Sequence, residues 1–373
     1  MSREFDPVAF LCELIRIPSS DPPGGELEVA RRCHAQMQVL GIDAELDEFQ
    51  PSRANVIGRI PGRGEKPPMI FSSHMDTVPV GDQPWDFDPL AGDLVDGHVR
   101  GRGASDMKSA LAAFIAAGAE ISRRPTPLAG DVILTFTAGE SADCLGARRL
   151  VEQGFQAEIG AFLCGEPSSL DIIVAEKAIL WLEAEARGQL GHVSGSAGVN
   201  AIDLMAGFLV ALRGFDLDLP GHPLLSPPTI NVGWIDGGTT INITPDRCAV
   251  GIDVRFGPAG DPDAVTAQIA AVVPPGITLK RLDFKPAVDE PPNSPFVAAC
   301  AAATRAEIGR DPATLGVAYY SDGAILLDGL DVPFAILGPG TLGMSGQANE
   351  TIPAENVDKA ARIYRRIAED WLA

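Results

Sequence analysis

The stretch "FTAGESADCLGARRLVEQG", residues 136–154, decides the fold because it joins a buried strand to a helix through a tight acidic turn. The apolar run "DVILTFT", residues 131–137, predicts the strand, and the carboxylate of Glu140 follows at its end. A strand that leads through a short turn into a helix is typical of a sheet covered by helices. Catalytic groups of such folds gather where strands end, so Glu140 is a candidate functional residue.

Strand and helix patterns alternate through the first third of the chain. Helical periodicity is found at 5–17, 26–40 and 107–122, and strand patterns at 54–60 and 68–74. This alternation predicts an α/β fold with a mostly parallel sheet covered by helices. The loops "SSHMDT", "GRGASDMK", "AGES" and "LCGEPSS" each follow a strand or begin a helix, so we expect them to meet at one edge of the sheet.

The pattern changes near residue 178, which predicts a second domain in this 373-residue chain. Residues 178–288 read as a compact two-layer α+β unit, and the proline-rich stretch "FKPAVDEPPNSP" marks its end. A helix, a strand and a final helix follow and would complete the first sheet. We therefore expect one domain built from 1–177 and 289–373, with 178–288 inserted into it.

Charge and hydropathy exclude several classes of partner. The formal net charge is −21 without a basic patch, which argues against nucleic acid and against an anionic membrane surface. No apolar run approaches the roughly 18 residues that cross a bilayer, and the amphipathic start predicts a helix and not a signal peptide, so we expect a cytoplasmic protein. The six cysteines lack CxxC spacing, which favours reduced, buried thiols.

Four of the loops carry side chains suited to a metal. His74, Asp106 and Glu166 form an N,O,O ligand set typical of Zn²⁺ or Mn²⁺, Asp76 can orient His74, and Glu140 can act as a base toward water. Each motif alone has an ordinary structural explanation, such as a satisfied histidine at a strand end or an N-cap at Asp106. Their occurrence together, in loops expected to meet, favours a metal site.

The chain also resembles a known family, and the resemblance spans nearly its whole length. The motifs that carry it are "HMDTVP", "GRGASDMKSALAA", "GEPS", "GHVSGSAGVNAI", "DVRF" and a late "GPG…NE". They are similar to those of the metallopeptidases and deacylases that include aminoacylase, acetylornithine deacetylase and succinyl-diaminopimelate desuccinylase. The resemblance implies a metal-binding catalytic domain carrying an inserted lid or dimerisation domain, and a homodimer or higher homo-oligomer.

The resemblance also implies residue roles. His74 and Glu166 match ligands of the first metal, Asp106 the bridging carboxylate, Asp76 the residue that orients the histidine, and Glu140 the general base.

In the inserted domain, three further residues match family positions. His192 matches a histidine that polarises the scissile carbonyl, often across a dimer. Asn242 and Arg255 match positions that hold the substrate carboxylate, and a guanidinium is well shaped for that task. The alternatives are an exposed, idle His192 and an Arg255 paired with Asp253 on the same strand face.

The sequence departs from the family where a second metal is usually bound. Ser141 stands where two-metal members have a carboxylate, and Gly346, preceded by Ser345, stands where they have a histidine. A hydroxyl is a poor ligand for zinc and glycine has no side chain. We therefore expect one divalent transition metal per chain.

These features predict a hydrolase that cleaves a C–N bond in a small, carboxylate-bearing substrate, such as an N-acyl amino acid or a short peptide. Metal-activated water would attack, with Glu140 as general base. Two alternatives stay open: hydrolytic deamination of an electron-poor aminobenzoate, as in 5-nitroanthranilate aminohydrolase, and a non-catalytic binding protein that kept the fold.

Overall fold

The chain divides into two compact units, which are described separately. The computed structural model describes residues 5–192, 194–195 and 198–373. Unit 1 contains the residues up to Val174 together with Asp289–Leu315 and Ser321–Ala373. Unit 2 contains Ala175–Val288 and the short segment Gly316–Tyr320. The lid and dimerisation roles expected for the inserted segment stay predictions.

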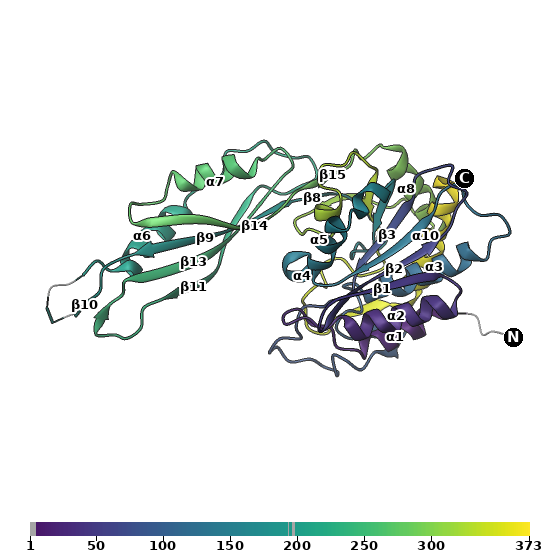
Figure 1. Ribbon diagram of the computed structural model, residues 1–373, viewed down its shortest axis with the longest axis horizontal. Helices are drawn as coiled ribbons and strands as arrows, with labels where there is room; N and C mark the ends of the chain where they lie inside the picture. Colours follow the sequence, from purple (N-terminus) through teal and green to yellow (C-terminus); the bar gives the residue numbers. More distant parts are fainter. Residues whose placement is uncertain (1–4, 193, 196–197) are drawn as a thin grey trace. The chain divides into compact units, whose positions relative to one another are not determined.

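Unit 1 is built on a nine-stranded sheet in the order β1-β2-β6-β3-β7-β17-β8-β15, with β16 paired to β8 (Figure 1). The central block β6-β3-β7-β17 is parallel, whereas β1-β2, β2-β6 and β17-β8 are antiparallel. The predicted α/β class is therefore confirmed. The strands are β1 (Asp43–Gln50), β2 (Arg53–Ile60), β3 (Met69–His74), β6 (Val132–Thr137), β7 (Ala161–Cys164), β8 (Ile172–Glu176), β15 (Val288–Asp289), β16 (Thr314–Val317) and β17 (Phe334–Ile336).

A long alanine-rich helix, α3 (Lys108–Ser122), lies against this sheet and is buried along almost its whole length. Small side chains let it pack closely both on the strands and on α10 (Ala354–Trp371). The ring of Phe114 stacks at 4.9 Å on Phe71 of β3 and at 4.3 Å on Tyr364 of α10. The other helices of unit 1 are α1 (Pro7–Ile15), α2 (Leu27–Val39), α4 (Glu140–Asp143), α5 (Leu145–Glu152), the 3-10 helix η1 (Phe155–Glu158), α8 (Pro295–Ile308) and α9 (Gly323–Leu326).

The turn that follows β6 differs in detail from the single helix start expected there. Gly139 has φ 72°, a left-handed conformation that costs glycine little, and α4 begins at the next residue. Cys144, with φ 52°, then separates α4 from α5. The tight turn places Glu140 just beyond the carboxyl end of β6.

A small three-stranded sheet supports the loops of unit 1. Its order is β18-β5-β4, formed by Thr351–Pro353, His98–Arg100 and Asp93–Val95. All pairs in it are antiparallel. It brings the segment before α10 beside the segment before α3.

Unit 2 has a four-stranded antiparallel sheet in the order β11-β13-β9-β14, with two helices packed on its core, and a two-stranded antiparallel sheet of β10 and β12. Alternate residues of β9 face inward, and Leu180, Leu182 and Ala184 are fully buried together with Phe208 of α6. The elements are β9 (Ala178–Arg187), β10 (Gly191–His192), α6 (Ala201–Arg213), β11 (Thr229–Gly237), β12 (Ile243–Thr244), β13 (Arg247–Phe256), α7 (Pro262–Ala270) and β14 (Ile277–Lys285).

Two expectations about side chains and hydropathy can be compared with the structure. All six cysteines are buried as free thiols, as the sequence predicts. Within the described residues, no helix combines the length and apolar character needed to cross a membrane.

Candidate metal centre

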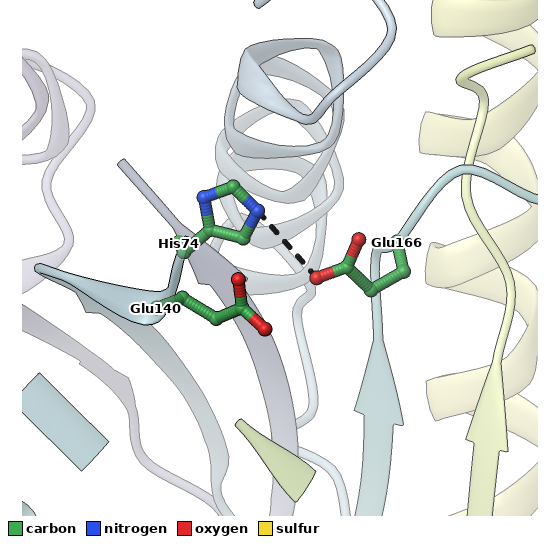
Figure 2. A group of neighbouring side chains, drawn as sticks. All are labelled: His74, Glu140 and Glu166. Atoms are coloured by element: carbon green, nitrogen blue, oxygen red, sulfur yellow. Dashed lines mark ion pairs between the residues drawn. The ribbon is translucent and has the colours of Figure 1, made fainter. Parts of the chain in front are cut away.

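Three acid or imidazole side chains lie at the carboxyl ends of three neighbouring parallel strands. His74 is the last residue of β3, Glu140 follows β6, and Glu166 follows β7. Because β3 lies between the other two strands, the three side chains converge. Their ligand atoms lie within 4.8 Å of one another, and Figure 2 shows them facing a common space. The structure thus brings these predicted site residues together.

The imidazole of His74 has a fixed orientation. Its Nδ1 donates to the backbone carbonyl of Asp76 at 3.0 Å, so Nε2 faces the carboxylates. Nε2 lies 3.1 Å from Oδ1 of Asp106 and 3.5 Å from Oε1 of Glu166. Fixing one imidazole nitrogen through a carbonyl is the usual way to present the other nitrogen to a metal.

Asp106 reaches the same point from the turn before α3. It does not cap that helix, because α3 begins at Lys108 and has no side-chain cap. The ordinary explanation of Asp106 as an N-cap is therefore wrong. The group whose ligand atoms all lie within 4.8 Å of one another contains Glu140 and not Asp106. Oδ1 of Asp106 nevertheless lies nearer to Nε2 of His74 than Oε1 of Glu166 does.

The electrostatics of this group suit a cation. Burial would lower the pKa of His74, but Asp76, Glu166 and the hydrogen bond with Asp106 outweigh it and raise the pKa well above the usual value. Burial raises the pKa of Glu140 well above its usual range; His74 opposes this, and the carboxylate of Glu166 adds to it. A divalent cation among these groups would relieve their repulsion.

Asp76 holds the turn that carries Glu140. Its Oδ1 accepts the backbone N–H of Glu140 at 3.1 Å, and its Oδ2 accepts the backbone N–H of Ser141 at 2.9 Å. The hydroxyl of Ser141 donates to the same Oδ2 at 2.5 Å. Asp76 therefore orients the predicted base as well as contacting His74, a role that its position in the sequence did not reveal.

A second serine hydroxyl lies at the other side of the group. Ser345 donates to Oδ2 of Asp106, while the adjacent Gly346 adopts φ 71° and offers no side chain. Of the two positions where the sequence departs from the family pattern, Ser141 therefore presents a hydroxyl that donates to Asp76. Gly346 presents no side chain, but the hydroxyl of the adjacent Ser345 donates to Asp106. Each of these donors occupies one carboxylate oxygen.

Sequence reasoning missed one buried acid near the site. Asp322 is 2% exposed, accepts from the hydroxyl of Thr137 at the end of β6, and has a pKa raised to about 6 by burial. It belongs to the stretch "YYSDGAIL", residues 319–326. An aspartate next to apolar residues that are expected to be buried is the signal that could have identified it.

The three predicted residues of unit 2 do not come together within one chain. His192 pairs with Ile243 beside Asn242, and both His192 and Asn242 are exposed. Arg255 lies near the far end of β13, and the strand from Arg247 to Arg255 spans about 26 Å at ~3.3 Å per residue. Figure 1 shows β10 at one tip of unit 2.

Each of these residues also has a local partner. Nδ1 of His192 lies 2.7 Å from the hydroxyl of Ser194, and Oδ1 of Asn242 accepts from Thr240 at 3.1 Å. The guanidinium of Arg255 donates to both oxygens of Asp253, at 2.9 and 3.2 Å, and to the carbonyl of Ala318 at 2.8 Å. The expected pairing with Asp253 is thus present, and the substrate-binding role of Arg255 stays a prediction.

Comparisons with known proteins identify the family of this chain. A model of the family described as peptidase family M20/M25/M40 matches residues 70–370. A succinyl-diaminopimelate desuccinylase from Rhodospirillum centenum is 30% identical, over 99% of this chain and 98% of its own length.

Solved structures show the same fold. An M20 family metallo-carboxypeptidase from Sulfolobus solfataricus superposes with a TM-score of 0.80 at 19% identity, covering 99% of both chains. A dinuclear metal-binding M20 peptidase from Bacillus subtilis gives 0.71 at 18% identity, covering 98% of both. The resemblance inferred from the motifs is confirmed. The chain belongs to peptidase family M20/M25/M40 and is a hydrolytic enzyme that acts on C–N bonds.

Proposed function

We propose that this enzyme hydrolyses the amide bond of a small carboxylate-bearing substrate, an N-acyl amino acid or a short peptide, with one divalent transition metal per chain. The observation that carries the proposal is the convergence of Asp106 and Glu166 on Nε2 of His74, with Glu140 beside them. One nitrogen and two carboxylates form a donor set that Zn²⁺ and Mn²⁺ accept. His74, Asp106 and Glu166 would hold the ion.

The protein's own groups supply the proton transfers. The ion, when bound, acts as a Lewis acid toward water and the scissile carbonyl. Glu140 accepts a proton from the attacking water and returns it to the leaving nitrogen, so that one carboxylate and one amine are released. Asp76 keeps Glu140 in place through the backbone N–H at 3.1 Å. Burial keeps bulk water away from this carboxylate, which is 7% exposed.

The single-metal part of the proposal rests on Ser141 and Ser345. The hydroxyl of Ser141, at one expected position of a second-metal ligand, donates to Asp76. The hydroxyl of Ser345, next to Gly346 at the other expected position, donates to Asp106. A hydrogen-bond donor next to a carboxylate oxygen competes directly with a cation for that oxygen. The site therefore has ligands for one ion and hydrogen-bond donors in place of the second.

Unit 2 is proposed to bind the substrate in a homodimer. His192 and Asn242 lie together at one tip of unit 2, far along the sheet from Arg255. A small amide cannot touch both ends of such a sheet at once. This separation within one chain supports the proposal that His192 acts on the substrate bound by a second copy. A cytoplasmic setting is part of the same proposal.

The test is a hydrolysis assay with the purified full chain. Protein loaded with Mn²⁺ or Zn²⁺ is incubated with N-succinyl and N-acetyl amino acids, dipeptides and aminobenzoates, and free amine, acyl acid and ammonia are each measured. We expect amine and acid from a carboxylate-bearing amide, and much less from its methyl ester. Release of ammonia from an aminobenzoate alone would replace the proposal with the deaminase alternative.

The metal count is tested separately, by elemental analysis of freshly purified protein. One tightly held ion per chain is expected. Two ions that both survive gel filtration would contradict the single-metal site.

A further inference from the structure

Glu350 is a fully buried carboxylate next to the proposed metal site, and the proposed reaction does not use it. It belongs to the late "NE" motif, immediately before β18. Its side chain accepts four hydrogen bonds, all from one short segment about 245 residues earlier in the chain. The donors are Nη1 of Arg102 at 2.7 Å and the backbone N–H groups of Gly103 at 3.1 Å, Ser105 at 2.8 Å and Asp106 at 2.9 Å.

The position of Glu350 is itself fixed by regular secondary structure. The next residue, Thr351, pairs with Arg100 in the β18-β5 ladder. The N–H of Gly101 donates to the backbone carbonyl of Glu350 at 3.0 Å. A carboxylate anchored in this way is a rigid support for the turn at residues 102–106, which is not itself part of a described strand.

That turn carries Asp106, which is held at both ends by one segment of chain. Oε1 of Glu350 accepts the backbone N–H of Asp106, and the hydroxyl of Ser345 donates to its side chain. Ser105 adds to this junction, because its hydroxyl donates to the carbonyl of Thr351 at 2.9 Å. Together these contacts aim Oδ1 of Asp106 at His74.

The donor count explains why a carboxylate is needed at this position. Oε1 accepts from Ser105 and Asp106, and Oε2 accepts from Arg102 and Gly103. A glutamine has one oxygen, so its amide NH₂ would face two donors. Buried donors without an acceptor cost on the order of 1–3 kcal/mol each, and the turn would move to satisfy them.

We propose that Glu350 is a positioning residue for the metal: it acts through the backbone of Ser105 and Asp106 to hold Asp106 as a ligand. The inference rests on the proposed function, since it takes Asp106 to be a ligand. Groups that orient metal ligands typically change metal affinity by roughly 10–100-fold when they are replaced. Glu350 touches neither substrate nor metal, so its effect appears in metal affinity and in the ligand geometry.

The test is the Glu350→Gln variant of the full chain. Zn²⁺ affinity is measured by competition with a chromophoric chelator, and the visible spectrum of the Co²⁺ form reports the ligand geometry. We expect affinity to fall by roughly 10–100-fold with an altered Co²⁺ spectrum. Affinity within threefold of the parent, with the same spectrum, would show that Glu350 only stabilises the fold.

Two variants make the result specific. Glu290→Gln changes another buried glutamate, which accepts the N–H of Phe334 at the start of β17, and it should leave Zn²⁺ affinity unchanged. If Glu290→Gln loses as much Zn²⁺ affinity as Glu350→Gln, the effect is general destabilisation and the inference is overturned. Asp106→Ala shows how much Zn²⁺ affinity the ligand itself contributes. If this variant keeps full affinity, the proposed metal site is wrong. If Asp106→Ala loses Zn²⁺ affinity but Glu350→Gln does not, only the positioning role of Glu350 is rejected.

A conservative variant covers the case in which Glu350→Gln does not fold. Glu350→Asp keeps the charge that pairs with Arg102 but withdraws the carboxylate by one methylene. It should fold and still bind Zn²⁺ several-fold more weakly than the parent protein. Unchanged affinity in a folded Glu350→Asp protein would overturn the inference in the same way.

Discussion

The candidate residues of unit 1 and of unit 2 differ in how they are held. In unit 1, His74, Glu140 and Glu166 are buried and fixed by neighbours from distant parts of the chain. In unit 2, His192 and Asn242 are exposed, and their side chains hydrogen-bond to residues two positions away. The first set is organised before any ligand arrives, whereas the second is proposed to gain its geometry from a substrate or another chain. Preorganised groups of the first kind carry most of the catalytic effect in enzymes.

The largest expected effect comes from removing the ion that unit 1 is arranged to hold. Chelation followed by desalting should abolish turnover and lower the melting temperature, because the carboxylates around His74 then repel one another. With the ion at 100 times its Kd, the lost stability is about 2.7 kcal/mol. Calorimetry measures it, with one equivalent of Zn²⁺ added back as the control. A melting temperature and turnover that both survive verified metal removal would contradict the assignment.

Replacing the base tests the same buried set without removing the ion. Glu140→Gln should lower kcat by ~10²–10⁴-fold, the usual contribution of a general base. Zn²⁺ affinity should change far less, because Glu140 is proposed to accept protons and not to bind the ion. The matched control is Glu152→Gln, at an exposed residue of α5, with no expected effect. If kcat stays within threefold, another group must take the proton.

A variant in unit 2 tests whether an exposed residue contributes at all. His192→Ala should lower turnover by ~10²-fold, the scale of losing one donor to a developing oxyanion. His222→Ala, also in unit 2, should keep full turnover. The His192→Ala variant should have the same melting temperature as the parent, because the side chain of His192 is exposed. Full turnover by His192→Ala would remove this residue from the mechanism.

Arg255 belongs to unit 2, but like the residues of unit 1 it is held by a charged partner, because its guanidinium is already paired with Asp253. Arg255→Lys should raise KM by roughly tenfold with little change in kcat, equivalent to losing a charged hydrogen bond of about 1.5 kcal/mol. Arg247→Lys, on the same strand and also paired with acids, is the control. Equal KM values for the two variants would make Arg255 a structural residue of unit 2.

The smallest effect is expected from Ser141→Ala. The variant loses the hydroxyl bond to Asp76 but keeps the backbone N–H bond at 2.9 Å. A single hydrogen bond contributes about 1 kcal/mol, so turnover should fall no more than about fivefold. Ser122→Ala, which loses a hydroxyl bond on α3 away from the site, serves for comparison. A loss as large as that of Glu140→Gln would mean that the hydroxyl itself takes part in the reaction.

Much of the fold follows from local patterns. The apolar runs at 68–74 and 131–137 became β3 and β6 within one residue at each start, and their ends fixed His74 and Glu140. The strand β1 was missed, because its sequence "DAELDEFQ" is mostly polar and its burial alternates weakly. It is an edge strand whose identity depends on pairing with β2.

Contacts between distant segments could not be predicted from the sequence. Glu350 reaches Asp106 across about 244 positions, and Asp322 reaches Thr137 across about 185. Nothing in local periodicity encodes such a pair, since it depends on how the sheet and its loops are assembled. Asp76 likewise proved to hold the turn of Glu140, a contact between loops of adjacent strands.

The sequence by itself determined the fold class, the ends of the strands that carry His74, Glu140 and Glu166, and the absence of carboxylate and histidine side chains at 141 and 346. These depend on residue identity and on periods of two to four residues. Only the tertiary structure decided that the serines at 141 and 345 donate to Asp76 and Asp106, and that Glu350 supports the turn of Asp106. Hydrogen bonds are directional and short, so their partners are known only once distant loops have been brought within about 3 Å of one another.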